Sequence, residues 1–308
     1  MSRLLDLQQL LLETSAAMAK AERFAVEGSD PESLSINIAS LGKRYAELER
    51  DFASAAADQG CDVCSYRLIP EGARPTVMGL TKALGTFQSL FSIVYQALKE
   101  GPRRRARLDA QVLEETSFGL GYVFPGSIGV VLTLPNERLL LGETPLDTSI
   151  RTIAEIGQLT SSEQIAHYAH QLGPASIRAA FAWARDHAES SFSADVEWLR
   201  GEQVRTGIRM NVPRFRELQQ IIGETSEQVV EEILVAGLLV GADVPRHAFH
   251  LVTDTGEIRG TFIDTISEAH TVELPKRYSA RIKKTTSIVY AVEEEKVSYL
   301  LLSLEPLT

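Results

Sequence analysis

The stretch from Thr76 to Lys99 constrains the fold more than any other part of the sequence. Large apolar residues recur there at alternating steps of three and four, the spacing of one helical face: Val77, Leu80, Leu84, Phe87, Phe91, Val94 and Leu98. Further apolar residues widen this face, so the predicted helix needs cover on two sides. Pro75 stands where the helix starts, and Gly101 and Pro102 end it.

We interpret this stretch as the core helix of a soluble domain rather than as a membrane span. It is long enough to cross a bilayer, but Lys82, Gln88 and Gln96 interrupt it and its flanks carry no interfacial anchors. The leucines near the N-terminus are interrupted by acidic residues, which indicates an amphipathic helix and not a signal peptide. Two cysteines in 308 residues fit a reducing compartment, so we expect a cytoplasmic protein that does not act at a membrane.

Residues 1–59 predict a helical hairpin. Residues 2–27 form one amphipathic helix, the sequence Gly28-Ser29-Asp30-Pro31 breaks it, and a second helix follows. The second helix carries an unbroken apolar seam: Leu34, Ile38, Leu41, Tyr45, Leu48, Phe52 and Ala55. This seam packs either within its own domain or against a second copy of the chain. We take its residues from Leu34 to Phe52 as the candidate self-association surface, which favours a homo-oligomer.

Residues 60–224 predict a mostly antiparallel sheet covered by helices. Strands are expected at Val63–Pro70, Arg105–Thr116, Asp195–Arg200 and Val204–Asn211, with a hairpin over Phe118–Leu134 that turns near Pro125. Helices are expected to start at Thr144, Thr160 and Pro174, and a short one to cover Pro213–Ile222. The hairpin strands are apolar on both faces, so we expect the core helix to cover one face and the helices after Thr144 the other.

The register of the Phe118–Leu134 hairpin depends on its turn. If Phe124 lies opposite Ser127, then Phe118, Leu120, Tyr122 and Phe124 line one face. Pro-Gly suits a type II turn, which splays a two-residue hairpin, so a longer loop or a bulge stays open.

The composition changes after Gly223, and residues 225–308 predict a second domain. Five strands are expected there: Val229–Val240, His247–Thr253, Glu257–Ile263, Tyr278–Val289 and Lys296–Leu304. Five strands in this length suggest a small β-barrel of SH3-like or OB-like type. The predicted fold class is therefore α+β, with a domain over residues 1–224 followed by this barrel.

Two groups of side chains have metal-ligand character. Cys61 and Cys64 have the spacing of half a zinc site, but the sequence holds no second cysteine pair to complete it. Glu163, His167 and His170 recur on one face of a predicted helix and could hold a divalent metal if a fourth ligand came from elsewhere. Ile165, Ala169 and Leu172 mark the opposite face as the buried one, so solvent exposure is the competing interpretation for the three.

Two basic clusters are candidate nucleic-acid contacts. One comprises Arg103, Arg104 and Arg105 after the core helix, with Lys99 and Arg107 nearby. The other lies along one barrel strand and comprises Arg277, Tyr278, Arg281, Lys283 and Lys284. Small barrels often bind nucleic acid through a basic face with aromatic residues. The net charge of −10 argues against non-specific binding to nucleic acid, and the arginine run could instead pair with Glu293–Glu295.

The sequence favours a non-catalytic interaction or assembly protein over an enzyme. It contains no nucleophile elbow, and its glycine-rich run after Phe118 leads into a strand instead of a phosphate-binding helix. We expect self-association, a protein partner bound through the C-terminal barrel, and no cofactor. One alternative is a nucleic-acid-binding accessory subunit, for example of a bacterial defence or repair system. The other is a metal-dependent enzyme that uses Glu163, His167 and His170.

Overall fold

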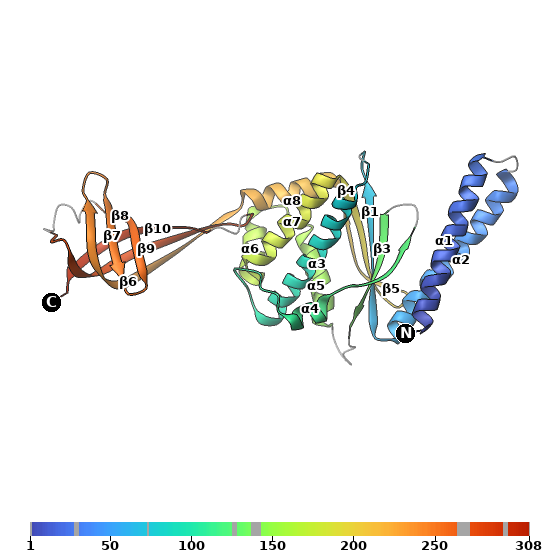
Figure 1. The fold of residues 1–308 in the computed structure, drawn as a ribbon, viewed down its shortest axis with the longest axis horizontal. Helices are drawn as coiled ribbons and strands as arrows, with labels where there is room; N and C mark the ends of the chain where they lie inside the picture. Colours follow the sequence, from blue (N-terminus) through green and yellow to red (C-terminus); the bar gives the residue numbers. More distant parts are fainter. Residues whose placement is uncertain are drawn as a thin grey trace. The chain divides into compact units, whose positions relative to one another are not determined.

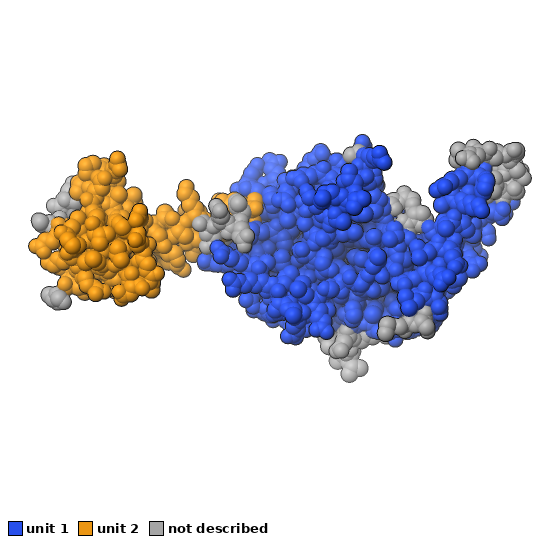
Figure 2. Space-filling model, in the orientation of Figure 1, with its two compact units in different colours: residues 1–224 blue, residues 225–308 orange. Residues whose placement is uncertain are grey.

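The computed structural model describes residues 2–27, 31–72, 74–124, 128–136, 143–263, 272–291 and 295–307. The chain divides into two compact units, residues 1–224 and 225–308 (Figure 2). The first unit combines helices with an antiparallel sheet, and the second contains a closed five-stranded barrel (Figure 1). The predicted α+β class is therefore confirmed.

The first unit is built on a five-stranded sheet with the order β2-β3-β1-β4-β5. Every neighbouring pair is antiparallel, and the strands are β1 (Cys61–Pro70), β2 (Gly119–Phe124), β3 (Ile128–Pro135), β4 (Phe192–Arg200) and β5 (Gln203–Met210). Strand β1 lies at the centre, and its side chains alternate between the two faces. Val63 belongs to the core on one face, and Tyr66 packs on Phe87 at the other.

One face of this sheet carries the helices that follow β1. They are α3 (Val77–Glu100), α5 (Pro145–Ile156), α6 (Ser162–Leu172), α7 (Pro174–Ser190) and α8 (Val212–Glu224) (Figure 1). Helix α3 packs on α5 and α7, and the ring of Phe91 stacks on Trp198 of β4 with the centroids 5.6 Å apart. By length and composition α3 could cross a membrane. Here its second half is the centre of the core, while Val77 and Met78 at its start are exposed.

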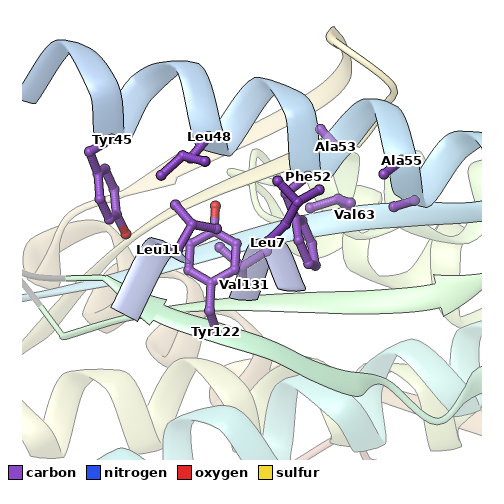
Figure 3. Packing of buried hydrophobic residues seen from close by; sticks show 11 residues of the cluster. Leu7, Leu11, Tyr45, Leu48, Phe52, Ala53, Ala55, Val63, Tyr122 and Val131 are labelled. Atoms are coloured by element: carbon purple, nitrogen blue, oxygen red, sulfur yellow. The ribbon is translucent and has the colours of Figure 1, made fainter. Parts of the chain in front are cut away.

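The other face is covered by the N-terminal hairpin of α1 (Ser2–Glu27) and α2 (Pro31–Asp58). Figure 3 shows the cluster that joins them to the sheet, formed by Leu7, Leu11, Tyr45, Leu48, Phe52, Ala53, Ala55, Ala56, Val63, Tyr122 and Val131. The expectation that helices after Thr144 cover this second face is wrong. Those helices share the face of α3, because the apolar seam of the hairpin supplies the second layer.

Residues 105–116, which we predicted as a strand, contain a helix instead. Helix α4 runs over Ala110–Thr116. The carboxylate of Asp109 accepts a hydrogen bond from the backbone N–H of Val112 at 2.8 Å and so caps its first turn. Val112 and Thr116 are its buried residues, four apart as a helix face requires. The strand predicted over Arg105–Thr116 from its partial alternation is therefore wrong.

The β2–β3 hairpin has both the longer connection and the register shift that its sequence leaves open. Phe124 lies opposite Gly129, and not Ser127, so the connection is longer than two residues; its residues 125–127 lie outside the described residues. The register shifts between Leu120 and Tyr122, where a Cβ on Gly121 would stand 2.8 Å from the carbonyl oxygen of Val131. As a result Tyr122 joins the hairpin-side cluster while Phe118 packs on Phe91, so the predicted common face of these two rings is wrong.

The second unit closes into a barrel with the order β10-β8-β7-β6-β9. Its strands are β6 (Ser226–Asp243), β7 (Ala248–Thr253), β8 (Gly256–Phe262), β9 (Lys276–Val289) and β10 (Glu295–Pro306). Closure depends on a short parallel pairing in which Leu300 and Leu301 of β10 face Thr261 and Phe262 of β8. The pairing of β6 with β7 shifts its register between Leu239 and Gly241.

Three strands of this unit run on beyond the other two (Figure 1). Strand β6 pairs with β9 from Ser226 onward, whereas β7 pairs with β6 only from Gly237. At the other side, β10 pairs with β9 from Glu295 and meets β8 at Leu300. We call residues 226–236, 279–289 and 295–299 the three-stranded ribbon.

Candidate interaction surfaces

The predicted self-association seam of α2 is used largely within the chain. Tyr45, Leu48 and Phe52 are buried against α1 and the sheet (Figure 3). The ring of Phe52 meets Tyr122 edge-on at 5.1 Å between centroids. Ile38 and Leu41 are half-buried, and the side chain of Leu34 lies outside the described residues. The best-packed part of the seam, from Tyr45 to Phe52, therefore already has its packing partners within the chain.

Polar groups accompany this junction of hairpin and sheet. The Tyr122 hydroxyl donates to the Glu49 carboxylate at 3.5 Å. Burial raises the pKa of Glu49, which that hydrogen bond and the charge of Arg67 partly oppose. The Tyr45 hydroxyl is buried and has no hydrogen-bond partner among the described residues. The hydrogen bond between Tyr122 and Glu49 joins the hairpin to the sheet.

The two cysteines do not form a joint site. They lie three residues apart on β1, so their side chains point to opposite faces of the sheet. Cys61 borders the hairpin-side cluster, and Cys64 is fully buried. Burial raises the pKa of both thiols, which disfavours the reactive thiolate.

Glu163, His167 and His170 lie on α6, as predicted, and all three side chains are exposed. The buried face of that helix is formed by Ile165, Ala169 and Leu172. Within the described residues, no three His, Cys, Asp or Glu side chains come together as a potential metal site. The arrangement gives the metal-dependent alternative no geometric support.

Sequence reasoning missed a buried ion-pair cluster at one end of the sheet. Arg200 of β4 donates two hydrogen bonds to Asp62, each 2.8 Å, and also reaches Asp147 at 2.9 and 3.0 Å. The indole of Trp198 and the amide of Asn136 donate to the same Asp62 carboxylate, at 3.1 and 2.6 Å. Both carboxylates bind the single guanidinium of Arg200, so this cluster joins β1, β4 and α5. Asp147 also completes the capping box at the start of α5.

A second buried network crosses the core on the helix side. The Tyr66 hydroxyl lies 2.8 Å from Nε2 of His187, and the Trp183 indole donates to that hydroxyl at 2.9 Å. Nδ1 of His187 lies 3.0 Å from the carbonyl oxygen of Phe192. A neutral imidazole that donates from Nδ1 and accepts at Nε2 satisfies both contacts. Burial lowers the pKa of His187 to about 4, which keeps it neutral near pH 7.

The basic run after α3 is held by local pairs. Arg103 bonds to Glu100 at 2.6 Å, and Lys99 to Glu115 at 2.6 Å. The carbonyl oxygen of Arg104 accepts a hydrogen bond from Arg178, and Arg105 is exposed. Its predicted acidic partners fall on residues 293–295, of which residues 293 and 294 lie outside the described residues.

The basic strand of the barrel has two faces. Tyr278 points inward and is buried, with its hydroxyl bonded to the backbone of Glu273, so its ring is not available to stack on a base. Lys284 bonds to Glu231 at 3.1 Å, and Arg277 lies 3.6 Å from Asp254. Arg281 and Lys283 point outward, and none of the described residues forms an ion pair with either. We call Arg277, Arg281 and Lys283 the cation row of β9.

An apolar row that the sequence did not single out runs beside these cations. It comprises Val230, Leu234 and Leu238 of β6, which are 52%, 74% and 36% exposed. Leu234 lies opposite Arg281 and Leu238 opposite Arg277 on the paired strand, so the two rows share one face of the sheet. We call the apolar residues the outer row of β6. Exposed apolar side chains next to cations, of which Arg281 and Lys283 form no ion pair with a described residue, are the features of a binding surface.

Comparison of the chain with protein-family models, with curated proteins and with solved structures found no match.

Proposed function

We propose that this chain is a non-catalytic interaction protein whose C-terminal barrel binds a protein partner. The observation that carries the proposal is the outer row of β6 beside the cation row of β9. Leu234, at 74% exposure, is among the most exposed large apolar residues described, and it lies against the unpaired Arg281. Such a face suits a partner that presents apolar side chains flanked by carboxylates.

The chemistry of the first unit supports the same proposal. Its buried polar groups are paired with one another: Asp62 with Arg200, and His187 with Tyr66. Groups engaged in this way hold the fold together, and neither network presents a nucleophile or a base to a substrate. The cytoplasmic location remains a prediction from the sequence.

Site-specific photo-cross-linking in cells that make the protein tests the proposal. A benzophenone amino acid is placed at Leu234, and the matched control carries it at Val204, which is 52% exposed on β5. We expect an adduct with a different protein at position 234 and not at position 204. The charge reversals Arg281→Glu and Lys283→Glu should lower its yield several-fold, because they replace attraction for carboxylates by repulsion.

Three other outcomes would count against a protein partner. Equal adducts at positions 234 and 204 would indicate chance collisions, and an adduct with the chain itself alone would indicate a second copy. Binding of a labelled 20-nucleotide single strand that weakens steeply with salt and is lost in the charge reversals would support the nucleic-acid alternative. We expect no such binding at physiological salt, since Tyr278 is buried and Lys284 is paired.

A further inference from the structure

The three-stranded ribbon leaves one edge of β6 without a neighbouring strand. Residues 226–236 pair with β9 on one side, and among the described strands none pairs with them on the other. In an antiparallel ladder every second residue directs its N–H and C=O away from the partner strand. This stretch therefore presents a row of backbone donors and acceptors to solvent.

The free edge has few of the features that protect edge strands from pairing. Residues 226–236 contain no proline, lysine or arginine, and the register with β9 shows no bulge from Ser226 to Leu239. Val230 and Leu234 are exposed on its outer face. The charged residues of this edge are Glu227, Glu231 and Glu232. An edge without a bulge can accept a further strand where such charges are offset.

The sequence of the edge indicates which strand it accepts. Residues 229–235 read Val-Val-Glu-Glu-Ile-Leu-Val, so Val229 and Val235, and Val230 and Leu234, lie at equal distances from Glu232, while Glu231 mirrors Ile233. In antiparallel pairing about that residue, Val230 lies opposite Leu234 of the second copy and Val229 opposite Val235. We propose that the free edge of β6 pairs with the same edge of a second copy of this chain. The two exposed apolar side chains then cover each other, which explains why both lie on a solvent-facing strand.

The charges on the ribbon are compatible with this register. Glu232 would face Glu232 of the second copy, but Lys283 lies opposite each Glu232 on β9. Across the outer face of the joined sheet, the order is then Lys283, Glu232, Glu232 of the second copy and Lys283 of the second copy. Each carboxylate therefore has an opposite charge beside it. On the other face, Glu231 is already bonded to Lys284 at 3.1 Å. Two ribbons would form one six-stranded sheet.

The limits of the free edge fit this register as well. Pairing about Glu232 covers residues 228–236 of both copies. The free edge ends at residue 236, because β7 pairs with that edge of β6 from Gly237 onward. The dimer does not require the proposed protein partner, because its hydrogen bonds join backbone groups; Val230 and Leu234 belong to both surfaces.

Sedimentation equilibrium on the full chain across nanomolar to micromolar concentrations tests the dimer. We expect a monomer–dimer equilibrium, and Val230→Lys should raise its dissociation constant by about tenfold or more, since two cross-strand apolar pairs are lost. Leu234→Ser, a milder change at an exposed site, should weaken the dimer in the same direction. Glu232→Gln should tighten it, because it removes the one like-charge contact of the interface.

Val297→Lys is the matched control. Val297 is 40% exposed on β10 at the opposite edge of the same ribbon, so this variant should dimerise like the parent chain. Backbone amides of residues 228–236 should also exchange more slowly at high protein concentration.

Several results would overturn the proposal. A strict monomer at all concentrations would do so, as would a dimer that Val297→Lys dissociates and Val230→Lys does not. A dimer that Glu232→Gln weakens would contradict the register. A cross-link from position 234 to another protein, together with a strict monomer, would leave the partner-binding function standing and remove only the β6 pairing.

Discussion

At the scale of single residues, His187 shows how burial sets a protonation state. Its ring stacks on Phe215 with centroids 4.2 Å apart, and both ring nitrogens face hydrogen-bond partners inside the core. Protonation would put a hydrogen on Nε2, which accepts a hydrogen bond from the Tyr66 hydroxyl. It would also bury the positive charge of the ring away from solvent. Burial therefore lowers the pKa of His187 to about 4.

This lowered pKa predicts a stability that falls on acidification. Between pH 6.5 and about 4 the unfolded chain binds a proton at His187 and the folded chain does not. The contribution of the neutral His187 to the free energy of unfolding is therefore complete above pH 6.5 and is lost as the pH falls to about 4. The loss amounts to about 3 kcal/mol at most. Urea unfolding of the first unit at pH 7 and pH 4.5 measures it. His187→Gln, which cannot titrate, should show a smaller difference between the two pH values; an equal difference would assign the effect to other groups.

At the scale of elements, barrel closure depends on a glycine. A Cβ on Gly260 of β8 would overlap the backbone carbonyl oxygen of Tyr299 and lie 2.9 Å from the ring of Phe249. The β8–β10 pairing that closes the barrel starts at the next residue, where Thr261 faces Leu300. The close approach of these two strands therefore needs a residue without a side chain.

Gly260→Ala should destabilise the second unit by about 2 kcal/mol, within the usual cost of overpacking a core. Gly241→Ala is the matched control, because its Cβ would meet the Cβ of His250 at an ordinary 3.7 Å. We expect that control to change stability by less than about 1 kcal/mol. Chemical unfolding followed by circular dichroism compares them. Equal effects would show that the contact with Tyr299 does not control closure.

Elements with strong local signals could be predicted from the sequence. The helix α5 starts at Thr144 as predicted, with a capping box between Thr144 and Asp147, and α3 ends at Gly101 as expected. The strand predicted at residues 105–116 failed because a seven-residue helix has too short a pattern to outweigh apparent alternation. The choice of face for each helix failed because both faces of the sheet are apolar, and the pattern does not say which helix covers which face.

The candidate site was harder to predict than the elements. The cation row could be identified, because Arg277, Arg281 and Lys283 alternate along one strand. The apolar row beside it could not be identified. Val230 and Leu234 have the pattern of core residues, and only the structure shows that β6 extends beyond the end of β7. The pairs Asp62–Arg200 and Tyr66–His187 join residues more than a hundred positions apart, and no local spacing reports such contacts.

At the scale of the whole molecule, two units with separate cores predict two unfolding events. The core of the first unit includes Phe52 of α2, whose buried ring meets Tyr122 edge-on. The barrel core is a separate cluster that includes Leu251, Ile282 and Leu301. Cooperative unfolding follows the packed core, so a change in one cluster should affect only its own unit.

Calorimetry of the full chain should therefore resolve two transitions. Phe52→Ala removes a buried ring at a cost of about 3 kcal/mol or more, which should lower the transition of the 224-residue unit by about 10 °C and leave the other in place. Gly260→Ala should lower the barrel transition by a similar amount and leave the first. If either substitution moved both transitions together, the units would unfold as one cooperative body, and the barrel could not be treated as an independent binding module.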